Sequence, residues 1–421
     1  MSPADRQYRP RLYDPVLADL LADFGAVMIT GARATGKTTT ARRFSTETAR
    51  LDEPGTANAF RADPDVALRR AGRPLLIDEW QEVPEVLAAV KRAVDSDPAP
   101  GQFVLTGSVR AELTHETWAG TGRVIRMHMY GLTEREVRAG LDAHRTAFVE
   151  RLATSGIDDL TVPPAPPSLD GYIEMALRGG FPELVYRLTT TRARRIWLRS
   201  YLDDLVTRDA AALGHSKDPS KLRAYLAVLA LNNAGMPTDT SLYGVAGINA
   251  KTAASYDQLL TNLYVLDLVS AWPLTGNRLK ALVRVPKRYL VDTGIAAAAA
   301  GVTVDDVLGD ADLLGRFFDA FGTAQLRPES ALMEAPPRMH HLRTHAGRQE
   351  IDLVFDLGRG RAVGIEFKAS NAVNGPDARH LLALREDLGD RFLAGAVLYS
   401  GTQLYEIADR VYAVPLCAVW G

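Results

Sequence analysis

The sequence has little cysteine and no long apolar runs. Cys417 is the single cysteine among 421 residues, so an internal disulfide and a zinc site built from several thiolates are both excluded. No run approaches the roughly 18 apolar residues of a membrane-spanning helix, and the first residues do not join a basic to an apolar segment as a secretory signal does. These absences predict a protein of the reducing cytoplasm that has no membrane partner.

An excess of charge of one sign is also lacking. The 49 Lys+Arg residues are balanced by 51 Asp+Glu residues, for a formal net charge of -2. Proteins that coat nucleic acid without sequence preference need many uncompensated basic side chains, so this class is excluded and any DNA contact must come from a local patch. At roughly 100–200 residues per domain, the length predicts two to four domains.

A phosphate-binding motif lies near the start of the chain. Residues 31–38 read GARATGKT and fit G-x-x-x-x-G-K-[ST], between an apolar strand-like run and a helical run. In this motif the glycines let successive N–H groups converge on the phosphates, the lysine adds a positive charge and the hydroxyl ligates Mg²⁺. ATP and Mg²⁺ are therefore the expected cofactors. The expected nucleotide-binding residues are Gly31, Ala32, Arg33, Ala34, Thr35, Gly36, Lys37, Thr38 and Thr39.

Two later strand-like runs end in polar side chains suited to hydrolysis. The first ends in Asp78 and Glu79. We expect Asp78 to hold Mg²⁺, mainly through a coordinated water, and Glu79 to polarise the attacking water. The second ends in Thr106, which, like Ser108 two residues on, is a candidate to contact the γ-phosphate. Hydroxyls at strand ends also commonly cap the backbone, and this alternative stays open for both.

A positive charge at the γ-phosphate speeds phosphoryl transfer, and one arginine is placed to supply it. Arg123 follows the Thr106 run in a glycine-rich loop. We expect it to act on the site of a second copy if the protein forms homo-oligomers. A surface arginine in a turn is the alternative interpretation of the same residue.

Near the C-terminus, carboxylates and a lysine follow the D…(D/E)-x-K pattern of restriction-endonuclease-like folds. Asp352 and Glu366 would share a divalent metal, and Lys368, two residues after Glu366 on one strand face, would orient a water. Asp319 lies where a further acid usually completes such a site. The alternative is a degenerate module without nuclease activity. It is favoured because residues 302–421 are more acidic than basic, which disfavours a polyanion.

The segment before this one predicts a winged helix: three helical runs followed by two strand-like runs. Its hairpin is basic, so DNA is a candidate partner. The expected DNA contacts are Lys251, Arg278, Lys280, Arg284, Lys287 and Arg288. The alternative is a module that docks a protein partner, because the helix that would enter the major groove is mostly apolar.

The whole chain resembles a widespread prokaryotic group of AAA-superfamily ATPases that carry a C-terminal domain of unknown function. The resemblance implies an ATPase core with strand order 5-1-4-3-2, a winged helix and a nuclease-like C-terminal fold. The motifs that carry it are, in chain order, GARATGKT (31–38), RLDEP (50–54), LLIDEWQEVP (75–84), LTGS (105–108), GLTERE (131–136), GGFPE (179–183), RD (208–209), PKRYLVDTG (286–294), and then IDLVFD, GIEFKAS and VPL.

The fold class expected is thus α/β: a P-loop AAA-type core with a winged helix and a restriction-endonuclease-like α/β C-terminal domain. The expected domains are an ATP-binding domain (1–140), a helical connector (141–215), the winged helix (216–300) and the C-terminal domain (301–421). The function expected is a Mg²⁺-dependent ATPase in which ATP switches the later modules between two arrangements. An ATP-regulated nuclease and a protein-binding scaffold that does not hydrolyse ATP are the alternatives.

Overall fold

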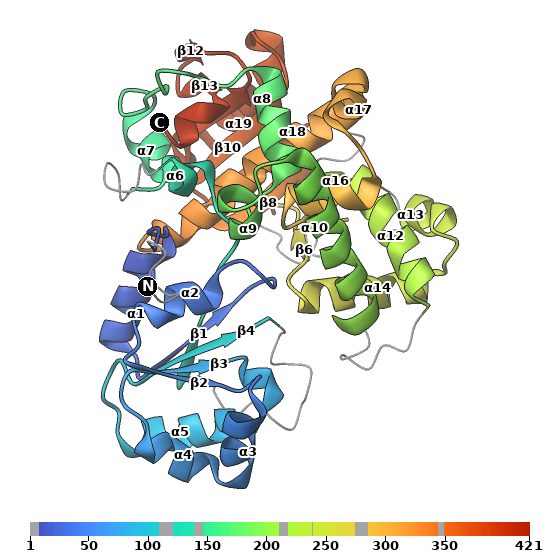
Figure 1. Cartoon of the computed structure of the whole chain (residues 1–421). Helices are drawn as coiled ribbons and strands as arrows, with labels where there is room; N and C mark the ends of the chain where they lie inside the picture. Colours follow the sequence, from blue (N-terminus) through green and yellow to red (C-terminus); the bar gives the residue numbers. More distant parts are fainter. Residues whose placement is uncertain are drawn as a thin grey trace. The chain divides into compact units, whose positions relative to one another are not determined.

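The computed structural model describes residues 8–108, 121–138, 146–209, 218–237, 239–273, 285–343 and 349–421. The chain forms two compact units, drawn in Figure 1. The first comprises Met1–Leu132, Phe181–Glu183 and Leu259–Val265, and the second comprises Thr133–Gly180, Leu184–Gln258 and Leu266–Gly421.

The first unit is built on a five-stranded parallel sheet in the order β2-β3-β4-β1-β5. This is the order 5-1-4-3-2 that the family resemblance implies, and the α/β fold class is confirmed. Its elements are α1 (Tyr13–Asp23), β1 (Ala26–Thr30), α2 (Lys37–Arg42), β2 (Glu47–Arg50), α3 (Pro54–Ala62), α4 (Pro64–Arg70), β3 (Leu75–Asp78), a 3-10 turn (Trp80–Glu82), α5 (Val86–Ser96), β4 (Phe103–Gly107) and β5 (Val124–His128).

The central strands of this sheet are mostly apolar because both of their faces are covered. All five residues of β1 are buried, as are all five of β4. On one face α3, α4 and α5 pack together against the sheet, with Phe60, Leu68 and Val90 in the shared core (Figure 1). The sheet therefore presents its carboxyl edge, where the strands end, as the place for polar function.

The second unit contains a six-stranded mixed sheet in the order β12-β13-β11-β10-β9-β8 and a group of helices. Its helices are α6 (Glu134–Val137), α7 (Phe148–Ser155), α8 (Leu169–Arg178), α9 (Pro182–Tyr186), α10 (Thr191–Asp204), α12 (Pro219–Leu231), α13 (Asp239–Val245), α14 (Ala250–Asn262), α16 (Thr293–Ala300), α17 (Val304–Gly309), α18 (Ala311–Glu329) and α19 (Arg379–Leu388). Parts of α9 and α14 belong to the first unit. Its strands are β6 (Leu266–Val269), β7 (Lys287–Leu290), β8 (Arg338–Arg343), β9 (Glu350–Asp356), β10 (Ala362–Lys368), β11 (Phe392–Tyr399), β12 (Tyr405–Ala408) and β13 (Val411–Pro415).

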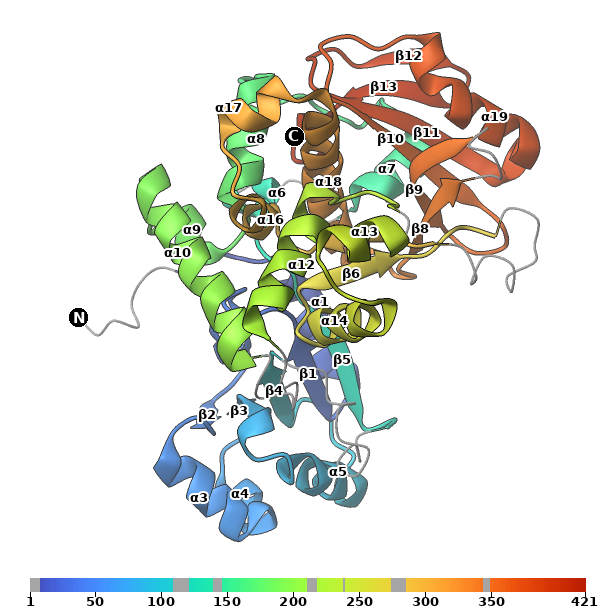
Figure 2. The same ribbon diagram turned by 90° about the vertical axis from the view of Figure 1, so that its right-hand side faces the viewer.

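Helices cover both faces of the six-stranded sheet, as Figure 2 shows for α19 on one side and α18 on the other. Alternate residues of β9 point to the two sides: Leu353 packs in the core with α18, and Val354 in the core with α19. Close approach needs glycines. A Cβ on Gly364 would lie 2.7 Å from Leu381 of α19, and one on Gly322 of α18 would lie 2.1 Å from Phe367.

The helices α12, α13 and α14 are followed by the antiparallel pair β6–β7, in the order that the sequence predicts. Their assignment as a winged helix stays a prediction. The expected boundary at residue 140 lies later than the end of the first unit at Leu132. The reason is that the next residues are anchored in the second unit: the Glu134 N–H donates to Gln325 (2.7 Å), and Arg135 pairs with Glu329 (3.1 Å).

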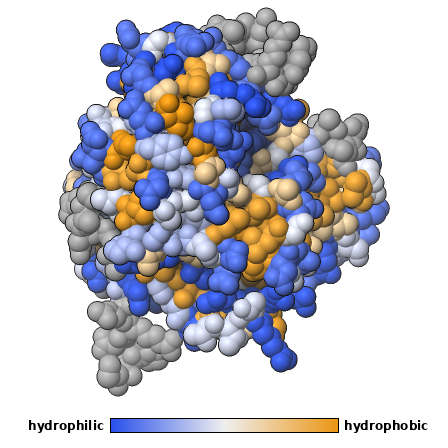
Figure 3. All heavy atoms as spheres, turned by 90° about the horizontal axis from the view of Figure 1, so that it is seen from above, coloured by the Kyte–Doolittle hydropathy of each residue, from blue (hydrophilic) through white to orange (hydrophobic). Residues whose placement is uncertain are grey.

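Large apolar side chains are also found at the surface. On the face shown in Figure 3 the apolar patches are interrupted by hydrophilic residues. Within the part of the chain that the structure describes, none of the helices combines the length and the hydropathy needed to cross a membrane.

Candidate functional site

The phosphate-binding loop joins the end of β1 to the start of α2, at the carboxyl edge of the first sheet. Two of its glycines have positive φ angles: +146° at Gly31 and +97° at Gly36. A Cβ on Gly31 would lie 2.2 Å from the Met129 carbonyl oxygen, so only glycine fits there. The backbone geometry that the motif predicts, a tight turn into a helix, is present.

Lys37 lies inside the loop and is buried. Its Nζ donates to the carbonyl oxygens of Gly31 (3.0 Å) and Ala32 (2.7 Å). Burial lowers the pKa of Lys37 to about 8, although the charges of Glu79 and Asp78 oppose this shift. A bound phosphate would supply the negative charge that carbonyl oxygens cannot, and would hold the ammonium in its charged form.

Thr38, Asp78 and Thr106 form one hydrogen-bonded group. The Thr38 hydroxyl donates to Oδ1 of Asp78 at 2.7 Å, and the Thr106 hydroxyl donates to the same oxygen. The structure therefore brings the two expected Mg²⁺ ligands, Thr38 and Asp78, to one point. Thr106, the expected γ-phosphate contact, also orients the Asp78 carboxylate. The hydroxyl of Ser108 is buried and has no hydrogen-bond partner in the described residues, so it is the better placed of the two to bind a ligand.

Glu79 is held in an unusual backbone conformation beside this group. Its φ of +55° is in the left-handed region, which is uncommon for a residue with a side chain. Its carboxylate accepts a hydrogen bond from the Gln81 amide, and the side chain is only partly buried. Such local strain is typical of functional positions, and it turns Glu79 away from the line of the strand.

Arg123 lies at the other edge of the sheet. It immediately precedes β5, and β5 runs parallel to β1 with Ala26 opposite Val124 and Thr30 opposite His128. The five-residue strand separates the two edges by roughly 13 Å. Arg123 is ion-paired with Asp95 and exposed. In its own chain it is therefore not placed at the phosphate loop, and its action on a second copy stays a prediction.

Arg11 supports the loop and was not expected from the sequence. Its guanidinium donates to the carbonyl oxygens of Thr35 (2.9 Å), Tyr130 (3.0 Å) and Gly131 (3.3 Å). It thus fastens the phosphate loop to the segment that follows β5. These contacts span 24 to 120 positions, and no short motif includes them.

The C-terminal carboxylates come together, but around a lysine. Nζ of Lys287 lies 2.8 Å from both Asp319 and Asp352. Oδ2 of Asp352 also accepts the Phe367 N–H (3.0 Å), and the Tyr289 hydroxyl donates to Asp319 (3.1 Å). The ammonium group therefore takes the central position among carboxylates that were expected to share a metal.

The charges of this cluster act on one another. Burial alone would lower the pKa of Lys287, but Asp319 and Asp352 raise it well above the usual value. Burial raises the pKa of Asp319 to about 6, and burial followed by the Asp352 charge raises that of Glu366. Among the described residues no group of three or more His, Cys, Asp or Glu is arranged to hold a metal ion. In this arrangement, these residues do not fit the expected metal site. Lys368, which was expected to orient a water, lies at the end of β10 and is partly buried.

The expected DNA contacts are divided. Lys287 and Arg288 are 2% and 7% exposed, and Arg288 pairs with Asp257 at 3.1 Å, so neither side chain is available to a DNA phosphate in this structure. Lys251 is exposed at the start of α14. Arg278, Lys280 and Arg284 lie outside the described residues.

Comparison with protein families agrees with the geometry of the phosphate loop. Residues 23–138 match the family model of an AAA domain. The N-terminal part of the chain is therefore similar to AAA domains, and it carries the phosphate-binding loop. Residues 169–306 match a domain of unknown function (DUF8612), and residues 314–419 match another (DUF4143). The last two matches describe relatedness without a function.

Similar proteins span most of the chain. Uncharacterised proteins of Mycobacterium tuberculosis (Rv2008c) and Mycobacterium bovis (Mb2031c) are each 28% identical over 396 residues, 92% of this chain and 79% of theirs. Among solved structures, the Walker-type ATPase PABY2304 of Pyrococcus abyssi is similar at a TM-score of 0.38 and 12% identity, covering 70% of this chain and 99% of that one. The Aeropyrum pernix ORC1 protein, solved in complex with DNA, is similar at a TM-score of 0.29 and 12% identity. The match covers 71% of this chain and 94% of that one. These scores are too low to support a functional argument.

Proposed function

We propose that the protein is a Mg²⁺-dependent ATPase that couples its nucleotide state to the arrangement of its second unit. The observation that carries the proposal is the hydrogen-bonded group of Thr38, Asp78 and Thr106 beside the buried Lys37. A hydroxyl and a carboxylate in direct contact at a phosphate loop are the donor set that Mg²⁺ prefers. The residues present therefore fit the metal.

Each side chain has a distinct role in this mechanism. Lys37 binds the β- and γ-phosphates, exchanging its carbonyl partners for phosphate oxygens. Thr38 and Asp78 would hold Mg²⁺, which when bound neutralises charge on the phosphates. Glu79 orients the attacking water and accepts its proton. Thr106 positions Asp78, and Ser108 offers its buried hydroxyl to the nucleotide.

The test is ATP hydrolysis by the wild type, Lys37→Ala and Glu79→Gln, each with and without DNA. Loss of a general base typically lowers the rate by about 10²–10⁴-fold, so we expect Glu79→Gln to bind ATP but to hydrolyse it at least about a hundredfold more slowly. Lys37→Ala should lose binding as well. Glu85→Gln is the matched control, because Glu85 is exposed in the same region and should leave the rate unchanged.

The outcomes separate the alternatives. Hydrolysis that depends on Lys37 and Glu79 and ignores DNA supports the switch and directs attention to protein partners. ATP binding without hydrolysis in the wild type would instead support a scaffold. Stimulation by DNA that falls steeply with salt would indicate phosphate contacts, for which the exposed Lys251 is the described candidate.

Nuclease activity of the C-terminal domain is the less favoured function. Lys287 is already ion-paired with Asp319 and Asp352, so a divalent cation would have to displace a buried ammonium. Removing one member of a buried ion pair is costly, which opposes that exchange. We accordingly expect Asp352→Ala to leave the level of DNA cleavage in Mg²⁺ or Mn²⁺ indistinguishable from that of the wild type. If DNA cleavage by the wild type disappears in Asp352→Ala, the result would support nuclease activity of the C-terminal domain.

A further inference from the structure

A pocket in the second unit is lined by arginines. It has a volume of about 250 Å³ and lies among α8, α10, α16 and the turn that leads into α17. Its positive side chains are Arg178 of α8 and Arg194, Arg195 and Arg199 of α10, against the single carboxylate of Glu174. All these elements belong to the second unit, so the pocket is separate from the phosphate loop of the ATPase domain.

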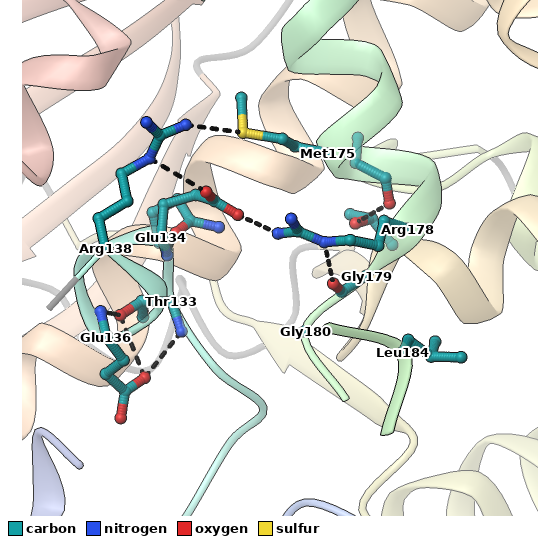
Figure 4. A network of polar contacts seen from close by, with 12 residues as sticks. Thr133, Glu134, Glu136, Arg138, Met175, Arg178, Gly179, Gly180 and Leu184 are labelled. Atoms are coloured by element: carbon teal, nitrogen blue, oxygen red, sulfur yellow. Dashed lines mark hydrogen bonds and ion pairs between the residues drawn. The ribbon is translucent and has the colours of Figure 1, made fainter. Parts of the chain in front are cut away.

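Two of the arginines have acidic neighbours outside the pocket. Arg178 donates to Glu134, a contact drawn in Figure 4, and to the Gly179 carbonyl oxygen at 3.3 Å. Arg195 lies close enough to Asp306 to lower the pKa of that carboxyl group, after the larger effect of hydrogen bonds from Thr303. These two side chains are therefore partly neutralised by the protein itself.

Arg194 is held by backbone carbonyl oxygens. Its Nε donates to the carbonyl oxygens of Leu184 (3.1 Å) and Leu188 (2.8 Å), and its side chain lines the pocket. Burial and the nearby charge of Arg178 lower the pKa of Arg194. Arg199 lies five residues further along α10 and lines the same pocket. Two guanidinium groups thus concentrate positive charge in a preformed hollow, which favours an anion.

The pocket walls are held in place by buried hydrogen bonds. Asp292, just before α16, accepts the Gly180 N–H (2.7 Å) and the Ile295 N–H (3.1 Å), and the Thr293 hydroxyl donates to the Ala176 carbonyl oxygen (2.6 Å). A Cβ on Gly179 would lie 2.4 Å from the Asp292 carboxylate. The GGFPE and DTG motifs therefore join α8 to α16 and preform the pocket, so a ligand would not have to order it.

The remaining wall is small and apolar. Ala297 and Ala298 of α16 and Leu198 of α10 line it, and alanine side chains leave the space that larger ones would fill. We propose that this pocket binds a small organic phosphate, with its phosphate on Arg194 and Arg199 and its apolar part against the alanines. The volume is below the roughly 300–1,000 Å³ usual for drug-sized ligands, so the ligand is compact.

The test is calorimetric binding of phenyl phosphate to the full-length Lys37→Ala protein, in which the ATPase loop has lost its phosphate-binding lysine. We expect phenyl phosphate to bind more tightly than inorganic phosphate, and phenol not to bind. Arg199→Gln should weaken binding by about tenfold or more, because each charge-assisted hydrogen bond contributes roughly that factor. Arg199 is exposed, so the variant should fold. Arg194→Lys keeps the positive charge but loses the planar guanidinium that can donate two parallel hydrogen bonds, so it should weaken binding similarly.

Arg192→Gln is the matched control, because Arg192 is exposed on the same helix and does not line the pocket. It should bind phenyl phosphate as the parent does. Three results would overturn the proposal: no binding of phenyl phosphate at millimolar concentration, equal weakening by Arg192→Gln, or Arg199-dependent binding of a DNA oligonucleotide without binding of phenyl phosphate. None of these results depends on ATP hydrolysis, so failure here and failure of the proposed ATPase are distinguishable.

Discussion

Lys37 and Lys287 are both buried lysines, and their neighbours give them opposite properties. Neutral carbonyl oxygens hold Lys37, so burial lowers its pKa to about 8 and its charge is best satisfied by a phosphate. Two carboxylates hold Lys287, and they raise its pKa well above the usual value despite its burial. The first lysine is arranged to meet a ligand, whereas the second already has its counter-ions inside the chain.

A substitution at Lys287 should show its structural role. We expect Lys287→Met to lower the free energy of unfolding of the second unit by about 3–5 kcal/mol, because it leaves the buried Asp319 and the partly buried Asp352 without their cation. Denaturant unfolding checks this, with Lys221→Met as the control since Lys221 is exposed on α12. A loss no larger than in the control would show that the ion pairs are weak.

His341 makes stability depend on pH. It is buried on β8, its Nε2 lies 3.2 Å from the Val285 carbonyl oxygen, and burial followed by the Lys287 charge lowers its pKa to about 4. The unfolded chain, with a histidine pKa of about 6.5, binds the proton more readily between these values, so stability falls as the pH falls through this window. The wild type should lose about 1–2 kcal/mol more between pH 7 and pH 5 than His341→Gln. Parallel pH profiles for the two proteins would contradict this.

At the scale of elements, local sequence patterns predict helices and strands better than they predict contacts between residues far apart in the chain. The apolar runs and the P-loop motif predict β1, β3, β4 and α2, because each signal lies within a few residues. The sequence also predicts the two strands that form the antiparallel pair β6–β7, but it predicts that their basic residues lie at the protein surface. Lys287 is buried against Asp319 and Asp352, which lie 32 and 65 positions away in the sequence. No local sequence pattern records contacts between residues so far apart. The same limit explains the missed role of Arg11.

A substitution at Arg11 tests the contacts that join the phosphate loop to the segment after β5. Because its guanidinium joins the phosphate loop to the segment after β5 through three carbonyl oxygens, Arg11→Lys should loosen the loop and raise the Kd for ATP by about tenfold. Titration with a fluorescent ATP analogue measures it. Arg69→Lys, an exposed change on α4, serves as the control. Unchanged affinity in Arg11→Lys would mean that the loop keeps its shape without this clamp.

At the scale of the molecule, the five-stranded sheet of the first unit and the second unit are linked by a short, well-anchored segment. The strand β5 lies beside β1, which carries the phosphate loop, and Thr133 opens the second unit five residues after His128 ends β5. A capping box between Thr133 and Glu136 starts α6, and Glu134 binds Arg178 (Figure 4). The buried pairing of this segment with α18 has no signature in the chain itself, so the sequence does not predict it.

This link gives the switch its most direct test. If nucleotide moves the phosphate loop relative to β5, the amide hydrogens of residues 133–138 should change their exchange rate when ATP is bound. We expect the change in Glu79→Gln, which holds ATP without hydrolysis, and none in Lys37→Ala. Hydrogen exchange followed by mass spectrometry resolves this segment from the rest. A response confined to Met1–Leu132 would show that nucleotide binding stops at the first unit, because a ligand shifts only those equilibria whose states it binds differently.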